Sequence, residues 1–315
     1  IGGGSGGFAS AIQANELGLK TLLVNSSLPI GGTCVNVGCV PSKALIHFAK
    51  DKNFDFFQAI EKELDLVKEL RREKYEEVLK NLENVEFIES KARFVSENEI
   101  EINGQKFQGE KFIIATGSTA NVPPIEGIKE VGYLTHISAL SNKNLPSSIA
   151  IIGAGPLGLE FSQIYLRFGA KVIILQRGNS IFPLGEKELT QRLKEILEKE
   201  GIEIRLNVEV KSARKENNKK IVKFLVEGRE EEIAVDEILL AAGKTPNTDD
   251  LGLEKANVKV NEKKAIVTNE FLQTSNPNIY AVGDVNDKPL RLETTSAREG
   301  TIAVLNAFTQ AKIKI

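Results

Sequence analysis

The hydrophobic positions of this chain fall into short apolar runs that alternate with longer amphipathic stretches. Such alternation is typical of an α/β fold, in which buried parallel strands alternate with helices that cover a sheet. The apolar runs 21–25 (TLLVN) and 171–176 (KVIILQ) predict two of these strands. Each follows a helix-like segment, at 8–17 and at 159–168, so the pattern predicts two β–α–β units of the same design.

Both predicted units begin with the same glycine motif. The motif G-x-G-x-x-G is formed by Gly2, Gly4 and Gly7 and again by Gly153, Gly155 and Gly158, and each strand ends 18 residues past the last glycine. The first glycine of such a motif allows a tight turn, the second lets the backbone approach a pyrophosphate, and the third lets helix and strand pack closely. The helix N-terminus then offers N–H groups to the phosphates. One copy is a weak signal, whereas two copies in the same context predict two dinucleotide sites.

Further elements are predicted between and after these units. The runs 112–117 (FIIATG) and 238–243 (ILLAAG) are apolar strands that enter small-residue turns. The segment 41–82 is predicted to be helical. Its many Glu and Lys residues indicate a solvent-exposed face with local ion pairs. Asn103-Gly104 predicts a tight hairpin turn, and 203–226 predicts an antiparallel insert in the second unit.

Composition and charge exclude several classes of function. A chain of 315 residues predicts roughly two or three domains. Hydrophobic content of 41%, charged content of 27% and a net charge of −2 give no general field for nucleic acid or anionic lipid. No apolar run approaches the ~20 residues of a membrane span, and no signal peptide is visible, so we expect a cytoplasmic protein without membrane or nucleic-acid partners. The chain contains no methionine and Ile1 directly precedes a glycine turn, which predicts that the sequence begins inside a β-strand.

The segment 31–43 (GGTCVNVGCVPSK) is the most specific stretch of the chain and holds its two cysteines, Cys34 and Cys39. An i, i+5 pair cannot close on a regular helix, because a disulfide needs Cα atoms within about 7 Å. A distorted turn before a helix near Pro41 would allow closure and would place Cys39 at a helix N-terminus that favours thiolate. A zinc site would need further ligands, and the chain has only two histidines. We therefore interpret the pair as catalytic rather than inert or zinc-binding.

The two glycine motifs, the cysteine segment, ATG at 115–117 and IYAVGD at 279–284 together resemble the class I pyridine nucleotide–disulfide oxidoreductases, in the order of that family. The resemblance implies two doubly wound, Rossmann-like domains with antiparallel β inserts. It assigns residues 1–120 to an FAD-binding domain with the redox pair, 121–245 to an NAD(P)H-binding domain, and 246–315 to a return to the FAD-binding or central domain. It also implies a C-terminal dimerisation domain that is absent from this sequence, and a homodimer for the full-length chain.

The same resemblance implies roles for individual residues. Cys39 is similar to the sulfur next to the flavin, and Cys34 to the interchange sulfur that faces substrate. Lys43 is similar to the family lysine near flavin N5, with Glu160 as its partner, and a cation there would stabilise reduced flavin. The positions expected to contact FAD are Gly2, Gly4, Gly7, Asn25, Gly32, Thr33, Ala115, Thr116, Gly117 and Asp284. Those expected to contact the nicotinamide nucleotide are Gly153, Gly155, Gly158, Gln176, Arg177 and Gly243.

Three positions depart from the family pattern, one of which is Lys244, where the family commonly has an arginine. Asn25 stands where the family usually has an acid that binds the adenosine ribose of FAD. Gln176 removes the acid that would select NADH through a 2′-hydroxyl, and Arg177 supplies a cation suited to a 2′-phosphate. We therefore expect NADPH in preference to NADH.

Within the family, CVNVGCVPSK (34–43), KTPNT (244–248) and TSNPNIYAVGD (274–284) are most similar to mercuric reductases. Tyr133 is similar to a tyrosine that approaches the metal in those enzymes. This predicts electron transfer from NADPH through FAD and the cysteine pair to Hg²⁺, held transiently by Cys34 and Cys39, because thiolates select soft metals. Two alternatives stay open: a dihydrolipoamide dehydrogenase that reoxidises its dithiol with NAD, and a non-catalytic flavin-binding or thiol redox-sensing protein.

Overall fold

A computed structural model describes residues 1–51, 53–183, 185–310 and 312–315. The chain divides into two compact units, each assembled from segments far apart in the sequence. Unit 1 contains Ile1–Asn36, Val67–Thr119 and Thr245–Ile315, and unit 2 contains Val37–Leu66 and Ala120–Lys244. The chain passes between them along α2 (Gly32–Val37), α4 (Phe56–Arg71), β7 (Ser118–Ala120) and β15 (Lys244–Pro246).

Unit 1 is built on parallel strands that lie in the order of a doubly wound sheet. These strands are β1 (Thr21–Asn25), β2 (Val85–Glu89), β6 (Phe112–Ile114) and β16 (Ile279–Ala281), of which β1 pairs with β2 and β6 with β16. The backbone of Ile1 connects the two pairs: its nitrogen donates to the Ile113 carbonyl at 2.7 Å, and its carbonyl accepts from the Ala115 N–H. The next residue, Gly2, donates to the Val24 carbonyl, so Ile1 runs between β1 and β6.

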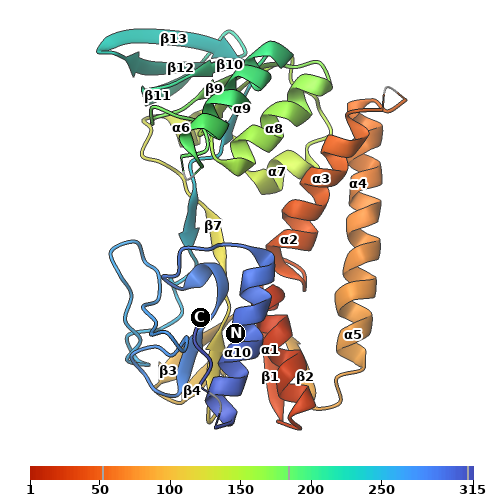
Figure 1. Cartoon of the computed structure of the whole chain (residues 1–315), viewed down its shortest axis with the longest axis vertical. Helices are drawn as coiled ribbons and strands as arrows, with labels where there is room; N and C mark the ends of the chain where they lie inside the picture. Colours follow the sequence, from red (N-terminus) through yellow and green to blue (C-terminus); the bar gives the residue numbers. More distant parts are fainter. Residues whose placement is uncertain (52, 184, 311) are drawn as a thin grey trace. The chain divides into compact units, whose positions relative to one another are not determined.

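Helices α1 (Ser5–Glu16) and α10 (Glu293–Phe308) lie side by side in unit 1 (Figure 1). Glycines permit this approach, because a Cβ atom on Gly300 would overlap the carbonyl oxygen of Gly6. The Ser10 hydroxyl bridges the two helices through the carbonyls of Gly6 (2.8 Å) and Gly300 (3.1 Å). The core of this unit includes the fully buried side chains of Phe94 and Ile114.

A three-stranded antiparallel sheet completes unit 1. It consists of β3 (Ala92–Ser96), β4 (Glu99–Ile102) and β5 (Gln105–Gln108). Asn103 and Gly104 join β4 to β5 with φ angles of 50° and 80°, and a short turn with two positive φ angles matches the right-handed twist of a hairpin. The predicted hairpin is therefore confirmed.

Unit 2 repeats this architecture. Its parallel sheet runs in the order β10 (Glu203–Arg205), β9 (Lys171–Leu175), β8 (Ser148–Ile152) and β14 (Glu237–Leu240). Its antiparallel sheet consists of β11 (Val208–Glu216), β12 (Lys219–Val226) and β13 (Arg229–Val235). The prediction of an insert at 203–226 was wrong in its bounds, because 203–205 pairs in parallel with β9 and the insert runs from Val208 to Val235.

Both faces of the parallel sheet of unit 2 are buried, as expected of a doubly wound fold. Ile149, Ile151 and Ile174 face one core, which they share with α8 (Pro156–Arg167) and α9 (Lys187–Glu200). Ala150 and Ile173 face a second core with strands of the antiparallel sheet. The shorter helices of this unit are α6 (Ile128–Val131) and α7 (His136–Ser141).

The predicted helical stretch 41–82 consists of several helices. They are α3 (Cys39–Phe48), α4, which begins at Phe56, a π-helical turn η1 (Arg72–Glu76) and α5 (Glu77–Lys80). Most charged side chains of α4 are exposed, as predicted, but Glu63 is 1% exposed. Burial raises the pKa of Glu63 to about 7, and its Oε2 atom has no hydrogen-bond partner among the described residues. None of the helices in the described part of the chain combines the length and the apolar character that crossing a bilayer requires.

Candidate dinucleotide and dithiol sites

The two glycine motifs form the same turn in the two units. Gly2 and Gly153 have φ angles of +107° and +111°, which side chains rarely adopt. A Cβ atom on Gly2 would overlap the carbonyl oxygen of Ala115, and one on Gly153 would overlap that of Ala241. The first glycine of each motif is therefore required by the turn itself.

The second and third glycines differ in what surrounds them. A Cβ atom on Gly7 would overlap the Gly2 carbonyl oxygen, and one on Gly158 would overlap that of Gly153, so the third glycine is fixed by packing. At the second glycine the space is open: a Cβ atom on Gly4 would lie 3.8 Å from the nearest atom, and one on Gly155 would meet nothing within 4 Å. Each turn thus leaves a cradle at the N-terminus of α1 or α8 that a pyrophosphate fits and a methyl group would fill.

The amides at the strand ends are buried and bonded within the fold. Asn25 accepts from the Gly3 N–H (2.9 Å) and donates to the Leu28 carbonyl (2.9 Å). Gln176 accepts from the Ala154 N–H (3.0 Å) and donates to the Ser180 carbonyl (3.1 Å). A carboxylate could not make the donated bond. Each amide therefore links a glycine turn to the loop that follows the strand, a role that residue type alone did not reveal, and their contacts with a ribose remain predictions.

Asp284 lies in unit 1 on the short 3-10 turn η2 (Gly283–Val285). Its Oδ2 atom accepts from the Ser118 hydroxyl at 2.6 Å. The turn is held by Glu299, which is 1% exposed and accepts from the Gly283 N–H (2.6 Å) and the Asn286 amide (2.9 Å). Burial raises the pKa of Glu299. Ser118 directly follows the ATG motif, so its position in the sequence could have marked it as a site residue.

The small-residue turns after β6 and β14 are each fixed by an asparagine. Asn247 donates its amide to the Thr116 carbonyl (2.8 Å) and accepts from the Thr116 hydroxyl through its own carbonyl (2.7 Å). In unit 2, Asn121 donates its backbone N–H to the Gly243 carbonyl and its side-chain amide to the Ala242 carbonyl. These asparagines were not predicted, although each occurs close to a β7 or β15 segment that carries the chain between units.

The first cysteine follows a pair of glycines with positive φ angles in unit 1. Gly31 and Gly32 have φ angles of +96° and +64°, and Cys34, on α2 just beyond Thr33, is half-buried. The buried Asn36 fastens this turn, because its amide donates to the carbonyls of Pro29, Ile30 and Gly32. Asn36 in turn accepts from the Arg71 guanidinium at 3.0 Å.

The second cysteine begins a helix in unit 2. The chain breaks at Gly38, with φ −134° and ψ −120°, and Cys39 is the exposed first residue of the ten-residue helix α3. The predicted distortion before Pro41 is present, and the helix N-terminus favours a thiolate at Cys39. Within the described residues, no group of three His, Cys, Asp or Glu side chains could hold a resident metal ion.

Glu160 on α8 joins this helix through two side chains. It forms an ion pair with Lys43 and accepts from the Ser42 hydroxyl at 2.8 Å. The Lys43 side chain is 58% exposed, so solvent weakens this attraction. The pairing of Lys43 with Glu160 is thus present, and its action beside a flavin stays a prediction.

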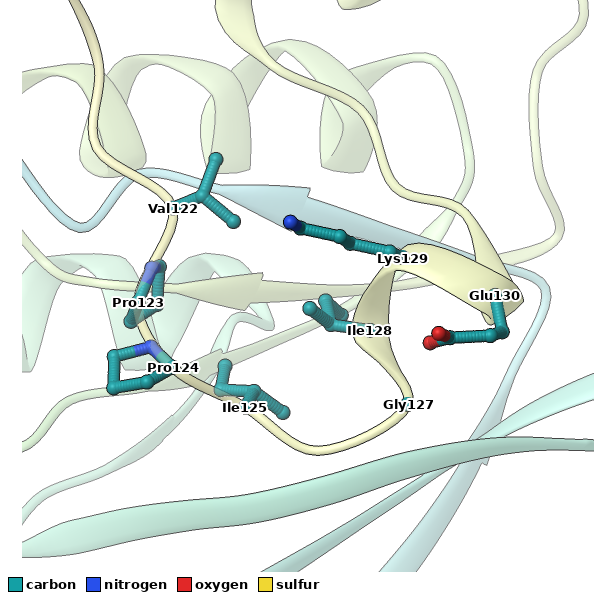
Figure 2. A pocket seen from close by; sticks show the side chains of 8 residues that line it. All are labelled: Val122, Pro123, Pro124, Ile125, Gly127, Ile128, Lys129 and Glu130. Atoms are coloured by element: carbon teal, nitrogen blue, oxygen red, sulfur yellow. The ribbon is translucent and has the colours of Figure 1, made fainter.

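Tyr133 is half-buried and packs against the core that contains Ile125 and Ile128. The contact of Tyr133 with a metal ion stays a prediction. A nearby hollow in unit 2 is shaped by the loop 122–127 and the start of α6. Figure 2 shows Lys129 extending across it toward Val122, with Pro123 and Pro124 along one wall. None of the eight side chains that line it is a predicted site residue.

Two Rossmann-like units, each with an open glycine cradle, and a cysteine pair on consecutive helices define a dinucleotide-binding protein of the flavoprotein disulfide reductase type. The model of the pyridine nucleotide–disulphide oxidoreductase family matches residues 1–305, and the chain belongs to that family.

Individual relatives carry different names. The chain is 36% identical over 331 residues to a mercuric reductase of Staphylococcus aureus, covering 100% of this chain and 60% of that protein. It is 38% identical over 329 residues to a dihydrolipoyl dehydrogenase of Thermus scotoductus, covering 98% of this chain and 69% of that protein. The solved structure of the HOCl-induced flavoprotein disulfide reductase RclA from Escherichia coli matches with a TM-score of 0.91 at 32% identity, covering 100% of this chain and 71% of that one. The chain thus spans about 60% of the length of the mercuric reductase.

Proposed function

We propose that the protein is an NADPH-dependent flavoprotein that delivers electrons through Cys34 and Cys39 to Hg²⁺. The observation that carries this proposal is the combination of two cradles open at Gly4 and Gly155 with a cysteine pair that ends in a helix N-terminal thiol. The similarity of the whole chain to a mercuric reductase supports the choice of substrate.

Unit 1 offers the groups suited to FAD. The Gly4 cradle would hold its pyrophosphate at the N-terminus of α1, and Asp284, oriented by Ser118, would accept a hydrogen bond from its polyol chain. In unit 2, Lys43 would place a cation beside the flavin ring, and Glu160 holds that cation in position. When bound, FAD supplies the relay that accepts a hydride from the nicotinamide and passes two electrons onward.

Unit 2 offers the groups suited to NADPH. The Gly155 cradle would hold the pyrophosphate, and the exposed Arg177 would meet a 2′-phosphate. Gln176 brings no negative charge to that position, because its side chain is an amide. Its hydrogen bonds with the Ala154 N–H and the Ser180 carbonyl fix the amide there. This arrangement supports NADPH over NADH.

The two thiols suit a soft cation. Reduced Cys34 and Cys39 would bind Hg²⁺ as thiolates, and the loss of their protons is easiest for Cys39 at the start of α3. Overall, NADPH loses a hydride, Hg²⁺ gains two electrons to become Hg⁰, and one proton is released.

The test compares acceptors on the full-length protein. We expect Hg²⁺ to stimulate NADPH oxidation more than lipoamide does, and Cys39→Ser to abolish both the stimulation and the long-wavelength thiolate–flavin absorbance on anaerobic NADPH titration. Ser141→Ala is the matched control, because the Ser141 hydroxyl donates to the carbonyls of Ile137 and Ser138 at the exposed end of α7. Equal NADPH oxidation with and without Hg²⁺ would refute the choice of substrate.

A second candidate is a dihydrolipoyl dehydrogenase, which the 38% identity to the Thermus scotoductus protein supports. That function predicts rapid NAD⁺ reduction by dihydrolipoamide and no Hg²⁺-dependent turnover. A protein whose absorbance spectrum and thiol count do not change with NADPH or NADH would instead be a non-catalytic flavin-binding or thiol-sensing protein.

A further inference from the structure

A π-helical turn lies in unit 1, where it packs against the glycine turn that precedes the first cysteine. It spans Arg72–Glu76, between the end of α4 and α5. Such turns insert one extra residue into a helix and occur frequently at functional sites. The half-buried residue on this turn is Tyr75, while Lys74 and Glu76 are exposed.

The ring of Tyr75 lies against the glycine turn that leads to Cys34. A Cβ atom on Gly31 would be 2.9 Å from both Cδ2 and Cε2 of Tyr75, so the ring occupies the space that a side chain there would need. On its other side the ring meets the edge of Phe8, with ring centroids 4.9 Å apart and planes at 62°. The phenol is therefore fixed in position by packing rather than by solvent-exposed contacts.

The same segment also holds the far end of the cysteine turn. Arg71, just before the π turn, donates to the Asn36 side chain at 3.0 Å, and its guanidinium is paired with Glu76 at 3.2 Å. Gly31 and Asn36 flank Cys34 in the sequence by three and two residues. Cys34 is thus bracketed by two attachments to one helical turn.

The phenol belongs to a ring that lies against Gly31, three residues before Cys34 in the chain. Burial first, and then the charges of Glu293 from α10 and of Cys34, together raise the pKa of Tyr75 to about 12. The phenol consequently keeps its proton at neutral pH and can act as a hydrogen-bond donor. Hydrogen bonding to a charged form favours that form.

We propose that Tyr75 is a positioning residue for Cys34: its ring fixes the Gly31 turn, and its hydroxyl donates a hydrogen bond to the Cys34 thiolate when that thiolate forms. The thiolate is then stabilised in the half-buried position from which it would bind a soft cation or exchange with a disulfide. This inference rests on the proposed function, in which Cys34 is the sulfur that faces substrate.

The test measures the reactivity of Cys34 directly. In a Cys39→Ser background, the rate of Cys34 alkylation by iodoacetamide is followed from pH 5 to pH 10 by peptide-resolved mass spectrometry. Tyr75→Phe, which keeps the ring, should move the midpoint of the profile upward by about half a unit to one unit, and should slow alkylation at pH 7 about three- to tenfold. Thermal unfolding of the same variants verifies that the ring packing is kept.

Tyr165→Phe is the matched control, because it removes a buried hydroxyl from α8 that has no hydrogen-bond partner among the described residues. It should leave the alkylation profile unchanged. An unshifted midpoint in Tyr75→Phe, or an equal shift in both variants, overturns the proposal. Failure of the proposed function has a different signature: NADPH would then release no thiols from the oxidised, otherwise unchanged protein, whatever the alkylation profile shows.

Discussion

Replacing Gly155 by alanine should separate nucleotide binding from folding. Gly155 has φ −76° and ψ −179°, which any residue adopts, and a Cβ atom there would meet nothing within 4 Å. Alanine lowers the entropy of the unfolded chain but is a poorer helix N-cap than glycine, and the two effects offset one another. We therefore expect the free energy of unfolding to change by less than about 1 kcal/mol.

The same methyl group fills the space that the pyrophosphate needs. Overpacking at a close contact costs about 1 to 3 kcal/mol, which corresponds to NADPH binding weakened by about 5- to 150-fold. Gly158→Ala is the contrasting variant, because its Cβ atom would overlap the fixed carbonyl of Gly153 and should lower the unfolding free energy itself. Gly4→Ala should behave like Gly155→Ala, with FAD in place of NADPH.

The measurements are fluorescence titration with NADPH and thermal unfolding without nucleotide, on both variants and the unchanged protein. Gly155→Ala should unfold like the unchanged protein and bind NADPH poorly. The reasoning is refuted if Gly155→Ala binds NADPH as tightly as the unchanged protein, or if it unfolds as readily as Gly158→Ala.

Three further predictions concern polar side chains. Gln176→Glu loses the donated bond to the Ser180 carbonyl, so unfolding should become easier by about 1 kcal/mol, and the kcat/KM ratio of NADPH to NADH should fall; an unchanged ratio would contradict the role of this position. Because the folded-state pKa of Glu63 is raised from 4.5 to about 7, its contribution to stability is fully present below pH 4.5 and is lost as pH rises through 7. In urea unfolding at pH 5, 6 and 8, Glu63→Gln should reduce the fall in unfolding free energy with pH by at most about 3 kcal/mol. The same pH dependence in both proteins would contradict this prediction. Ser118→Ala should weaken FAD retention in ultrafiltration about tenfold by leaving Asp284 without its donor, whereas retention equal to that of the unchanged protein would argue against that bond.

The sequence predicted the parts of the fold that depend on local spacing. The two glycine motifs and the strands that end 18 residues later were enough for two β–α–β units, because turn, helix and strand lengths are fixed by backbone geometry. Hydrogen-bond partners could not be predicted, since nothing in the residue type shows that the side chains of Asn25 and Gln176 point to the glycine turns.

The π turn could have been predicted from the spacing of inward positions in the sequence. Inward positions recur every four residues at Val67, Arg71, Tyr75 and Leu79, whereas a regular helix repeats every 3.6. The extra residue of the π turn absorbs the difference. That the segment 37–66 belongs to unit 2 could not be predicted, because it depends on tertiary contacts such as those of Ser42 and Lys43 with Glu160.

The Ser10–Gly300 hydrogen bond joins residues 290 positions apart, and this separation has a consequence for biosynthesis. A ribosome that adds 5 to 20 residues per second needs about 15 to 60 s to span that interval. During this time α1 has been synthesised but α10 has not, so the surface of α1 that packs against α10 stays exposed in the nascent chain. Residues 120–244 are synthesised well before α10, so most of unit 2 can fold while unit 1 is still incomplete. Codon changes that slow translation near residue 300 should therefore lengthen the period in which the nascent chain depends on chaperones.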